Sequence, residues 1–374
     1  MIYLDYCATT PVDKKVLNTF NKVCMDYPGN SNSLHKLGAD AHELEEYATD
    51  NIKKMLKLNN KDIIYTSGAS EANNHAIKGI CFKYKNRGKH IITTYLEHSS
   101  ISNTFNYMSD LGYDIDYVKL DDDGRVDLNH FKKLLRNDTV FVSVCMVDSE
   151  LGIRQPIEEI NKILKDYPKC FFHVDCTQAL GKIKIDFDLM DLASLSMHKI
   201  YGMKGIGMLI KNKSISILPL IHGGKSSTEY RSGTPALPLI VSSMKAIELA
   251  IDDLDSKYEY VSKLNKKIVD VIGQYEDIYI NSTKYSISYV INISLGNIKS
   301  ETFVHAMDEY DIYLSTKSAC SDLSTISDSV YAVVKDRDRA SKSIRISLSY
   351  KTTEEEIDKF LVLFDEVYKK LNFV

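Results

Sequence analysis

The chain has 374 residues, of which 44% are hydrophobic and 26% are charged, and its formal net charge is −4. This composition is typical of a globular protein large enough for two domains, and the negative charge argues against a nucleic-acid surface. We see neither a signal peptide nor a membrane-spanning run, so we expect a cytoplasmic protein without membrane or direct nucleic-acid contacts. The seven cysteines form no C-x-x-C pair and no metal-finger spacing, and we expect no metal site.

The N-terminal part begins with an extended stretch. Residues 1–15 start with a strand-like apolar run, and a polar turn at residues 29–35 precedes a helical pattern. Leu37, Ala41 and Leu44 follow the spacing of one helical face. We therefore predict an extended lead-in and, after the turn, an amphipathic helix.

The middle of the chain alternates between short apolar runs and amphipathic helical stretches. We predict strands at residues 63–66, 90–94, 140–144 and 170–174, and helices at residues 71–84 and 157–164. Such alternation predicts an α/β fold with a mostly parallel sheet and helices on both faces. Ligands of these sheets bind at the carboxyl ends of the strands. Polar segments follow four predicted strand ends, at residues 67–70, His98, Asp175 and residues 196–199.

The C-terminal part has a different pattern. Residues 237–272 have helical spacing and are predicted to form two helices. Strand-like runs at residues 289–293 and 343–348, followed by an amphipathic helix at residues 354–371, predict a smaller α+β domain.

Two of the polar segments together favour a cofactor site. Lys199 follows an apolar run, with Ser196 and His198 just before it, and burial beside other cations would leave its amine neutral and nucleophilic. Taken alone, such a segment is more often a solvated turn. Asp175 ends a predicted strand, with Gln178 three residues later, and on its own could simply cap a helix. Pyridoxal phosphate (PLP) needs both a lysine that binds it covalently and a carboxylate that faces its pyridine nitrogen, so the pair favours PLP.

With these motifs the chain resembles the cysteine desulfurases of iron–sulfur cluster and nitrogenase assembly, which are class V aminotransferases with fold type I. The resemblance extends from the run Tyr-Leu-Asp-Tyr-Cys-Ala-Thr-Thr-Pro at residues 3–11 to residues 343–348 and 352–356. It implies a large PLP-binding domain at residues 15–250. It also implies a small domain, formed by residues 1–14 and 251–374, that carries a catalytic cysteine loop.

The resemblance implies that PLP contacts Ala69, Ser70, His98, Ser149, Asp175, Gln178, Ser196, His198, Lys199 and Thr234. In the family, the residues that match Ala69 and Ser70 hold the cofactor phosphate at a helix N-terminus. The residue that matches His98 stacks on the ring and moves protons. The residue that matches Thr234 reaches the partner subunit's cofactor, which implies a homodimer with shared active sites. Without the family context, Ser70 would be read as a helix cap and His98 as a surface residue.

Three further residues concern the substrate. Asn30 and Arg345 match residues that hold the carboxylate of cysteine, and Arg345 would do so through a bidentate fork. Cys320, at the end of a Ser-Ala-Cys run, matches the mobile nucleophile of the long-loop members of the family, which receives sulfur as a persulfide. The implied catalytic residues are thus Cys320, Lys199 and His98. Without the family context, Arg345 would more often be a surface strand residue.

The chain departs from the family pattern at four places. Ser31 replaces a proline, Ser149 replaces an asparagine that contacts the PLP ring oxygen, and Lys317 replaces a glycine. Residues 225–229 also differ from the pattern. The sequence leaves open what these changes do to activity.

We therefore predict an enzyme that converts L-cysteine to L-alanine with a persulfide on Cys320. The sulfur would pass to an iron–sulfur scaffold or a tRNA-thiolation protein. A selenocysteine lyase or an aminotransferase of the same fold remains an alternative that needs Lys199 and Asp175 but no mobile Cys320. A catalytically weakened sulfur-trafficking scaffold would account for the departures. The sequence does not decide whether Cys7 or Cys176 reacts as well.

Overall fold

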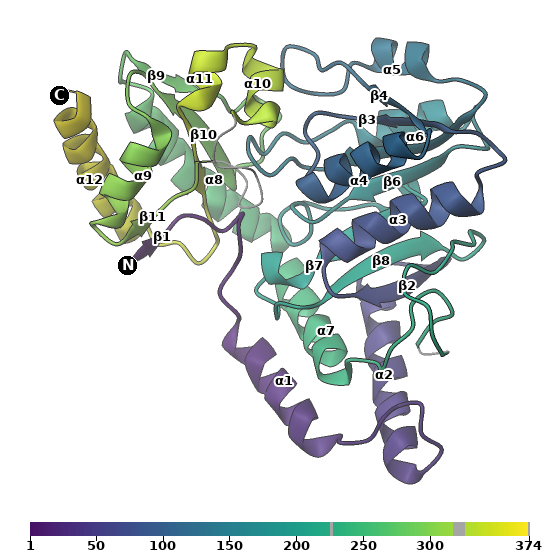
Figure 1. Cartoon of the computed structure of the whole chain (residues 1–374). Helices are drawn as coiled ribbons and strands as arrows, with labels where there is room; N and C mark the ends of the chain where they lie inside the picture. Colours follow the sequence, from purple (N-terminus) through teal and green to yellow (C-terminus); the bar gives the residue numbers. More distant parts are fainter. Residues whose placement is uncertain (225–226, 317–325, 373–374) are drawn as a thin grey trace.

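The computed structural model describes residues 1–224, 227–316 and 326–372. Its central element is a seven-stranded sheet with the order β2-β8-β7-β6-β5-β3-β4 (Figure 1). The strands are β2 (Lys61–Thr66), β3 (His90–Thr93), β4 (Asp114–Tyr117), β5 (Thr139–Cys145), β6 (Phe171–Asp175), β7 (Leu192–Ser196) and β8 (Gly207–Asn212). Among these strands β8 runs opposite to the others and is antiparallel to both β2 and β7, and the remaining pairs are parallel. The prediction of a mostly parallel sheet is therefore confirmed.

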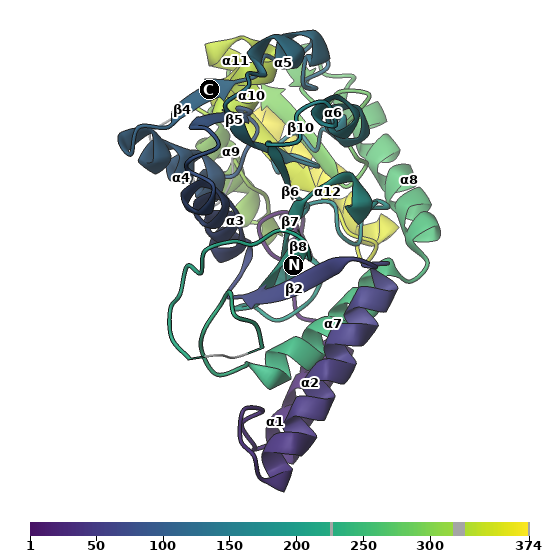
Figure 2. The same ribbon diagram turned by 90° about the vertical axis from the view of Figure 1, so that its right-hand side faces the viewer.

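Helices cover both faces of this sheet, as Figure 2 shows most clearly. One face carries α3 (Ala69–Lys83) and α4 (Ser99–Asp110), whose buried apolar residues share one core with the sheet. The other face packs against α2 (Lys36–Met55), α5 (Leu128–Leu134), α6 (Ile157–Leu164) and α7 (Leu237–Ile251). In α6 the buried residues are Ile157, Ile160 and Leu164, which form one apolar stripe that faces the core.

A helical arm formed by α1 (Lys14–Asp26) and α2 projects from the sheet (Figures 1 and 2). Both helices pack against α7 near the sheet. The loop that joins them lies at the tip of the arm, and Met25, Leu34 and Leu37 expose apolar side chains there. The lead-in of residues 1–15 starts with the strand β1 but contains a turn at residues 6–8 and ends where α1 begins at Lys14, and α1 itself was not predicted.

The C-terminal part forms a second, antiparallel sheet of β9 (Ile278–Ile280), β10 (Val290–Leu295) and β12 (Ser343–Ser347). Its helices are α8 (Leu254–Ile272), α9 (Ser300–Asp308), α10 (Asp328–Val334), α11 (Arg337–Ser341) and α12 (Glu354–Asn372). The N-terminal strand β1 (Ile2–Tyr3) pairs in parallel with β11 (Ile312–Tyr313), so the start of the chain lies beside this C-terminal part. A domain division near residues 14 and 250 stays a prediction.

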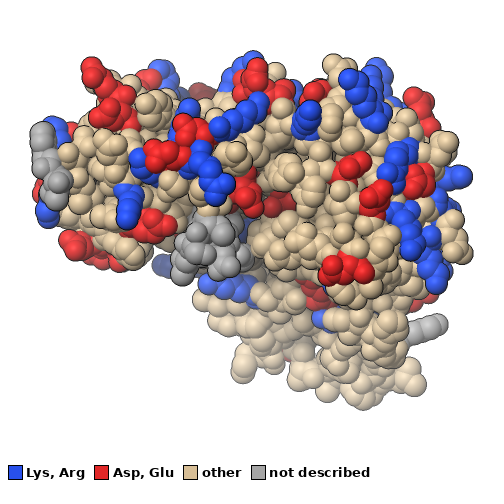
Figure 3. Space-filling view, turned by 45° about the horizontal axis from the view of Figure 1, so that its top comes forward, with Lys and Arg blue, Asp and Glu red and all other residues tan. Residues whose placement is uncertain are grey.

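The surface carries mixed charges. On the face in Figure 3, the basic and acidic side chains lie interspersed, in keeping with the small net charge of −4. None of the helices described by the structure has both the length and the apolar character that a membrane span requires.

Candidate active site

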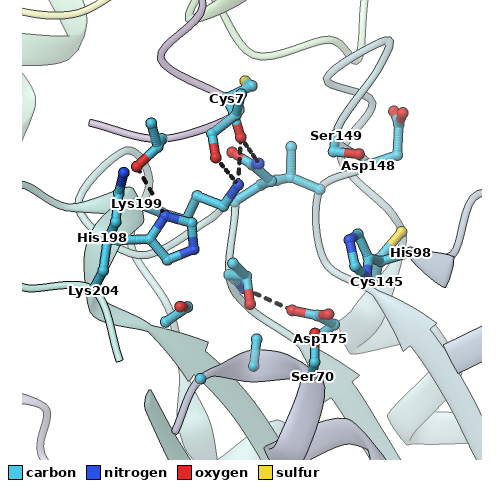
Figure 4. Close-up of a pocket in the computed structure, with 18 of the residues that line it drawn as sticks. Cys7, Ser70, His98, Cys145, Asp148, Ser149, Asp175, His198, Lys199 and Lys204 are labelled. Carbon is cyan, nitrogen blue, oxygen red and sulfur yellow. Dashed lines mark hydrogen bonds between the residues drawn. The ribbon is translucent and has the colours of Figure 1, made fainter. Parts of the chain in front are cut away.

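A cavity of about 500 Å³ lies where the carboxyl ends of β5, β6 and β7 meet the start of α3 (Figure 4). Most of the predicted site residues line it: Ala69, Ser70, His98, Ser149, Asp175, Gln178, Ser196, His198, Lys199 and Arg345. Parallel strands end at the same edge of a sheet, which brings together residues that lie far apart in the chain. The lining residues come from segments between Cys7 and Arg345.

Lys199 stands in the single 3₁₀ turn Met197–Lys199 that follows β7. Its Nζ donates hydrogen bonds to the carbonyl oxygens of Cys7 at 2.6 Å and Ala8 at 2.7 Å. Burial lowers the pKa of this amine from 10.5 to about 8, and the nearby cations Lys182 and Arg345 act in the same direction. The lysine therefore has the lowered pKa that a nucleophilic amine needs.

Asp175 ends β6 and points its carboxylate at the opposite side of the cavity (Figure 4). One oxygen accepts a hydrogen bond from Asn73 Nδ2 at 2.9 Å, and the other accepts from the backbone N–H of Thr177 at 2.9 Å. Asp175 thus accepts a hydrogen bond from the turn after β6, as expected if it served only as a cap. It also presents a carboxylate to the cavity.

His98 caps the N-terminus of α4 and lines the cavity. Its Nδ1 accepts a hydrogen bond from the backbone N–H of Ser100 at 3.1 Å, so the neutral ring carries its proton on Nε2. Burial lowers the pKa of His98 below 6.5, with Lys199 adding to the effect and Asp175 opposing it. At neutral pH this imidazole is therefore uncharged and able to exchange a proton at Nε2.

His198 supports the lysine turn from the same segment. Its Nδ1 lies 3.1 Å from Thr9 Oγ1, and burial, together with Lys199 and Lys204, lowers its pKa to about 4. A neutral His198 adds no positive charge beside Lys199. Ser196, also buried, ends β7 two residues earlier.

The start of α3 forms the floor of the cavity. Gly68 occupies the cap position, and it has no side chain that could satisfy the first N–H groups of the helix. The alternative interpretation of Ser70 as the helix cap is therefore wrong. A helix start with this arrangement attracts an anion through its dipole and its N–H groups, which suits a phosphate next to Ala69 and Ser70.

Arg345 reaches the cavity from β12 and is buried. Its Nη1 donates to the backbone carbonyl of Ser149 at 2.9 Å, and its Nη2 donates to Asp5 Oδ1 at 2.7 Å. Its Nε is buried and has no hydrogen-bond partner among the described residues. A guanidinium has five N–H donors, so Arg345 retains donors for a carboxylate ligand. Ser149 meets Arg345 through its backbone, a contact that the replacement of asparagine does not alter.

Two predicted residues that the structure describes, Asn30 and Thr234, do not line this cavity. Asn30 is exposed in the loop between α1 and α2, where its Oδ1 accepts from the N–H of Asn32. The prediction that Asn30 joins Arg345 is not met within one chain, because the helical arm carries the loop away from the cavity (Figure 1). Thr234 lines a separate small pocket together with Ser67. Cys320 lies outside the described residues.

The structure adds contacts that sequence reasoning missed. The backbone carbonyls of Cys7 and Ala8 hold Lys199, and such acceptors leave no signature in the side-chain pattern. Asn73, one helical turn into α3, holds Asp175. Lys204 also lines the cavity, and only its position in the glycine-containing segment after Lys199 could have signalled it.

The buried thiols near the site differ in position. Cys145 lines the cavity and Cys176 does not, and burial raises the pKa of both thiols well above the usual value. Neither is a thiolate at neutral pH, which argues against reaction at Cys176 in competition with Cys320. Cys7 contributes its backbone carbonyl to the site.

Comparison with known proteins gives the same picture. The model of the aminotransferase class V family matches residues 2–360. A NifS/IcsS protein homolog of Lactobacillus delbrueckii subsp. bulgaricus is 38% identical over 99% of this chain and 97% of its own length. A cysteine desulfurase IscS of Dictyoglomus turgidum is 35% identical over 100% of this chain and 96% of its own length. A solved structure of a NifS-like protein superimposes with a TM-score of 0.92 at 34% identity and covers 100% of both chains.

The fold and the site thus define a PLP enzyme of fold type I. The chain belongs to the aminotransferase class V family and, within it, to the NifS/IscS-like cysteine desulfurases, which depend on PLP. The cavity fits this cofactor on its own evidence. It offers an amine with a lowered pKa at Lys199, a carboxylate at Asp175 and an anion-attracting helix start at Ala69.

Proposed function

We propose that the chain acts on free L-cysteine, releases L-alanine and holds the sulfur as a persulfide on Cys320. The observation that carries this proposal is the convergence of Lys199, Asp175 and Arg345 on one cavity. These are the three groups needed to bind the cofactor covalently, to keep its ring protonated and to hold an amino-acid carboxylate.

In this proposal Lys199 and Asp175 would hold PLP, and Ala69 and Ser70 would hold its phosphate. When bound, PLP would supply an electron sink that weakens bonds at the substrate carbon atoms. The Lys199 amine would bond to the cofactor and would move protons at the substrate. The Asp175 carboxylate would face the pyridine nitrogen. His98 would face the ring and exchange a proton through Nε2.

Arg345 orients the substrate. Its remaining N–H donors bind the carboxylate of L-cysteine, while Asp5 and the Ser149 carbonyl keep the guanidinium in place. Arg345 is buried at this ion pair and Asp5 is half-buried, so the pair restricts the rotation of the arginine side chain and the direction of its fork.

Sulfur transfer needs a thiolate. The Cys320 thiolate attacks the sulfur of the bound cysteine, an S–S bond forms, and the bond between sulfur and the β-carbon breaks. The electron pair of that bond remains with the carbon side, and protonation of the β-carbon gives alanine. The persulfide then passes its outer sulfur to an acceptor protein, either an iron–sulfur scaffold or a tRNA-thiolation protein. A reducing compartment, which we propose is the cytoplasm, keeps such thiols free.

We further propose that two copies form a homodimer in which Thr234 reaches the partner's cofactor phosphate. Two features support this. Thr234 is exposed and lines a pocket outside its own chain's cavity, and the helical arm presents exposed apolar side chains at Leu34 and Leu37. An apolar surface of this kind often marks an interface.

The test uses Cys320→Ala, with Cys24→Ala as a matched control because Cys24 is exposed on α1. Alanine and persulfide are measured together after L-cysteine is added, and PLP absorbance is recorded. We expect Cys320→Ala to retain the PLP absorbance and to lose alanine formation by at least about a hundredfold, whereas Cys24→Ala resembles the wild type. Undiminished alanine formation by Cys320→Ala would remove that thiol from the reaction.

A further inference from the structure

One lysine behind the cavity is buried without an obvious structural reason for its burial. Lys182 is buried, and its Nζ donates to Gln178 Oε1 at 2.6 Å. No ion pair joins Lys182 to any carboxylate in the described ranges. By contrast Lys211, another buried lysine, pairs with Asp62 at 3.0 Å. Burial of a cation without a carboxylate is costly, and burial accordingly lowers the pKa of Lys182. The hydrogen bond to Gln178 therefore points to a role for Lys182 there.

The hydrogen bond from Lys182 determines which way the Gln178 amide faces. An ammonium group has donors only, so the atom that it contacts must be the amide oxygen. The amide nitrogen then faces the other way, and Gln178 Nε2 donates to the carbonyl oxygen of Cys7 at 3.0 Å. The amide nitrogen carries two hydrogens, and this bond uses one of them. The other is available to a ligand in the cavity that Gln178 lines.

The Cys7 carbonyl connects this amide to the reactive lysine. It accepts from Gln178 Nε2 at 3.0 Å. It also accepts from Lys199 Nζ at 2.6 Å (Figure 4). An unbroken chain of hydrogen bonds therefore leads from Lys182 through Gln178 and Cys7 to Lys199. Because the Gln178 amide holds the Cys7 carbonyl by one hydrogen bond, this carbonyl has less freedom to move away from the Lys199 amine that donates the other.

We propose that Lys182 is a positioning residue for the active site, which acts by holding the Gln178 amide with its nitrogen toward the Cys7 carbonyl and the cavity. The inference rests on the proposed roles of Lys199 and Gln178 but not on the identity of the substrate. Lys182 touches neither the cavity nor, in this arrangement, the reacting atoms.

The electrostatics agree with the geometry. A flipped Gln178 would turn its oxygen toward the Cys7 carbonyl, which is repulsive, and would give the Lys199 ammonium a further acceptor nearby. Both the flip and the loss of the neighbouring cation at Lys182 favour the charged amine, so both raise the pKa of Lys199. Lys182 therefore helps to keep the amine partly neutral.

The experiment measures this amine directly in the full-length, cofactor-free chain. The protein is treated briefly with acetic anhydride at a series of pH values, and mass spectrometry gives the labelled fraction of the Lys199 peptide. Three variants are compared with the wild type: Lys182→Met, Lys182→Gln and the control Lys61→Met. Lys61 is a matched control because it is buried and bonds Met190 O and Asn212 Oδ1 away from the cavity.

We expect the labelling midpoint of Lys199 to rise by about one pH unit in Lys182→Met, which means about tenfold less neutral amine at pH 7. Lys61→Met should leave the midpoint unchanged. Lys182→Gln keeps an N–H donor without the charge and should give a smaller shift of the labelling midpoint. If Lys182→Met does not fold, the midpoint of Lys182→Gln tests the proposal instead. An unchanged midpoint in the folded Lys182 variants would overturn the proposal.

A second comparison tests whether Lys182 acts through Gln178. In a Gln178→Leu background there is no amide to hold, so Lys182→Met should shift the midpoint by less than half as much. A shift of the same size in both backgrounds would mean that Lys182 acts by charge alone and would refute the positioning role. Labelling of Lys199 does not depend on alanine formation, so a failure of the desulfurase proposal would be seen separately.

Discussion

At the residue scale, the setting of Lys199 explains how a lysine becomes reactive. Its hydrogen-bond partners in the structure are two backbone carbonyls, of Cys7 and Ala8. Carbonyl groups orient an amine without adding a full negative charge, so they stabilise the ammonium less than a carboxylate would. Burial then remains the largest influence on the pKa and lowers it to about 8.

This lowered pKa predicts how cofactor attachment depends on pH. A pKa of about 8 leaves roughly a tenth of the amine neutral at pH 7, against about one in three thousand for an unshifted lysine. Only the neutral amine attacks PLP, so we expect the rate of PLP incorporation into the cofactor-free protein to rise with pH and level off above about 8. Stopped-flow absorbance would measure this rate.

The control for this experiment is Nα-acetyl-lysine under the same conditions, because its only amine is an unshifted side-chain amine, and its rate should still be rising well above pH 9. A protein rate that does not change between pH 6.5 and 9 would show that Lys199 is not the titrating group.

The sequence was sufficient to predict that Lys199 and Asp175 belong to one site, because both follow apolar runs and stand beside a short recognisable pattern, and both line the same cavity. It could not reveal what positions them. Asn73 is one polar residue in a helix, and Lys182 resembles a surface lysine until the fold buries it. The family resemblance placed Asn30 near the substrate, but within one chain the arm separates it from Arg345.

At the scale of elements, the start of α3 depends on a very close approach by β8. A Cβ atom built on Gly207 would lie 2.6 Å from Gly68 Cα and 2.6 Å from the carbonyl oxygen of Leu195. Both contacts are with backbone, which cannot move aside as a flexible side chain can. Gly207 therefore lets the first strand residue of β8 pack directly beneath the helix start that we propose binds phosphate.

Gly207→Ala should displace the start of α3. We expect a loss of about 1–3 kcal/mol in stability from this overpacking and a roughly tenfold weaker affinity for PLP. Thermal unfolding and equilibrium binding of PLP to the cofactor-free protein would measure the two effects.

Gly224→Ala serves as the matched control, because no atom of the residues that the structure describes lies within 4 Å of a Cβ built there. This variant should change neither quantity. If Gly207→Ala bound PLP as tightly as Gly224→Ala, the proposed link between β8 and the phosphate site would be wrong.

The alternation of apolar runs correctly predicted β2, β3, β5 and β6, since buried strands of a parallel sheet are continuously apolar. It could not predict the reversed direction of β8, because an apolar pattern reads the same in both directions. Nor did it reveal β4, an edge strand in which none of the residues is fully buried. The helix α1 was missed because only Val16 and Val23 are buried on it.

At the scale of the whole molecule, the proposed homodimer makes a prediction about shared sites. Lys199→Ala and Thr234→Asp should each be inactive as homodimers, the second because a carboxylate would repel the cofactor phosphate. If Thr234 serves the partner's cofactor, a mixed dimer contains one intact site. Co-expression of the two variants should then restore about a quarter of the wild-type activity, measured as alanine formation.

The matched control combines Lys199→Ala with Asp175→Asn. Both residues line the cavity of the same chain, so a mixed dimer contains no intact site and should show no recovery. A lack of recovery with Thr234→Asp as well would place Thr234 in its own chain's site.

The N-terminal segment has a consequence for the synthesis of the protein. Ile2 pairs with Ile312, and Asp5 holds Arg345 although 340 positions separate them. A nascent chain that emerges from the ribosome must therefore keep its earliest residues without their partners until almost all of it has been translated. If translation stops before residue 345, the Cys7 and Ala8 carbonyls that accept hydrogen bonds from Lys199 lack the β12 strand beside them. Truncated products should therefore assemble no working catalytic centre.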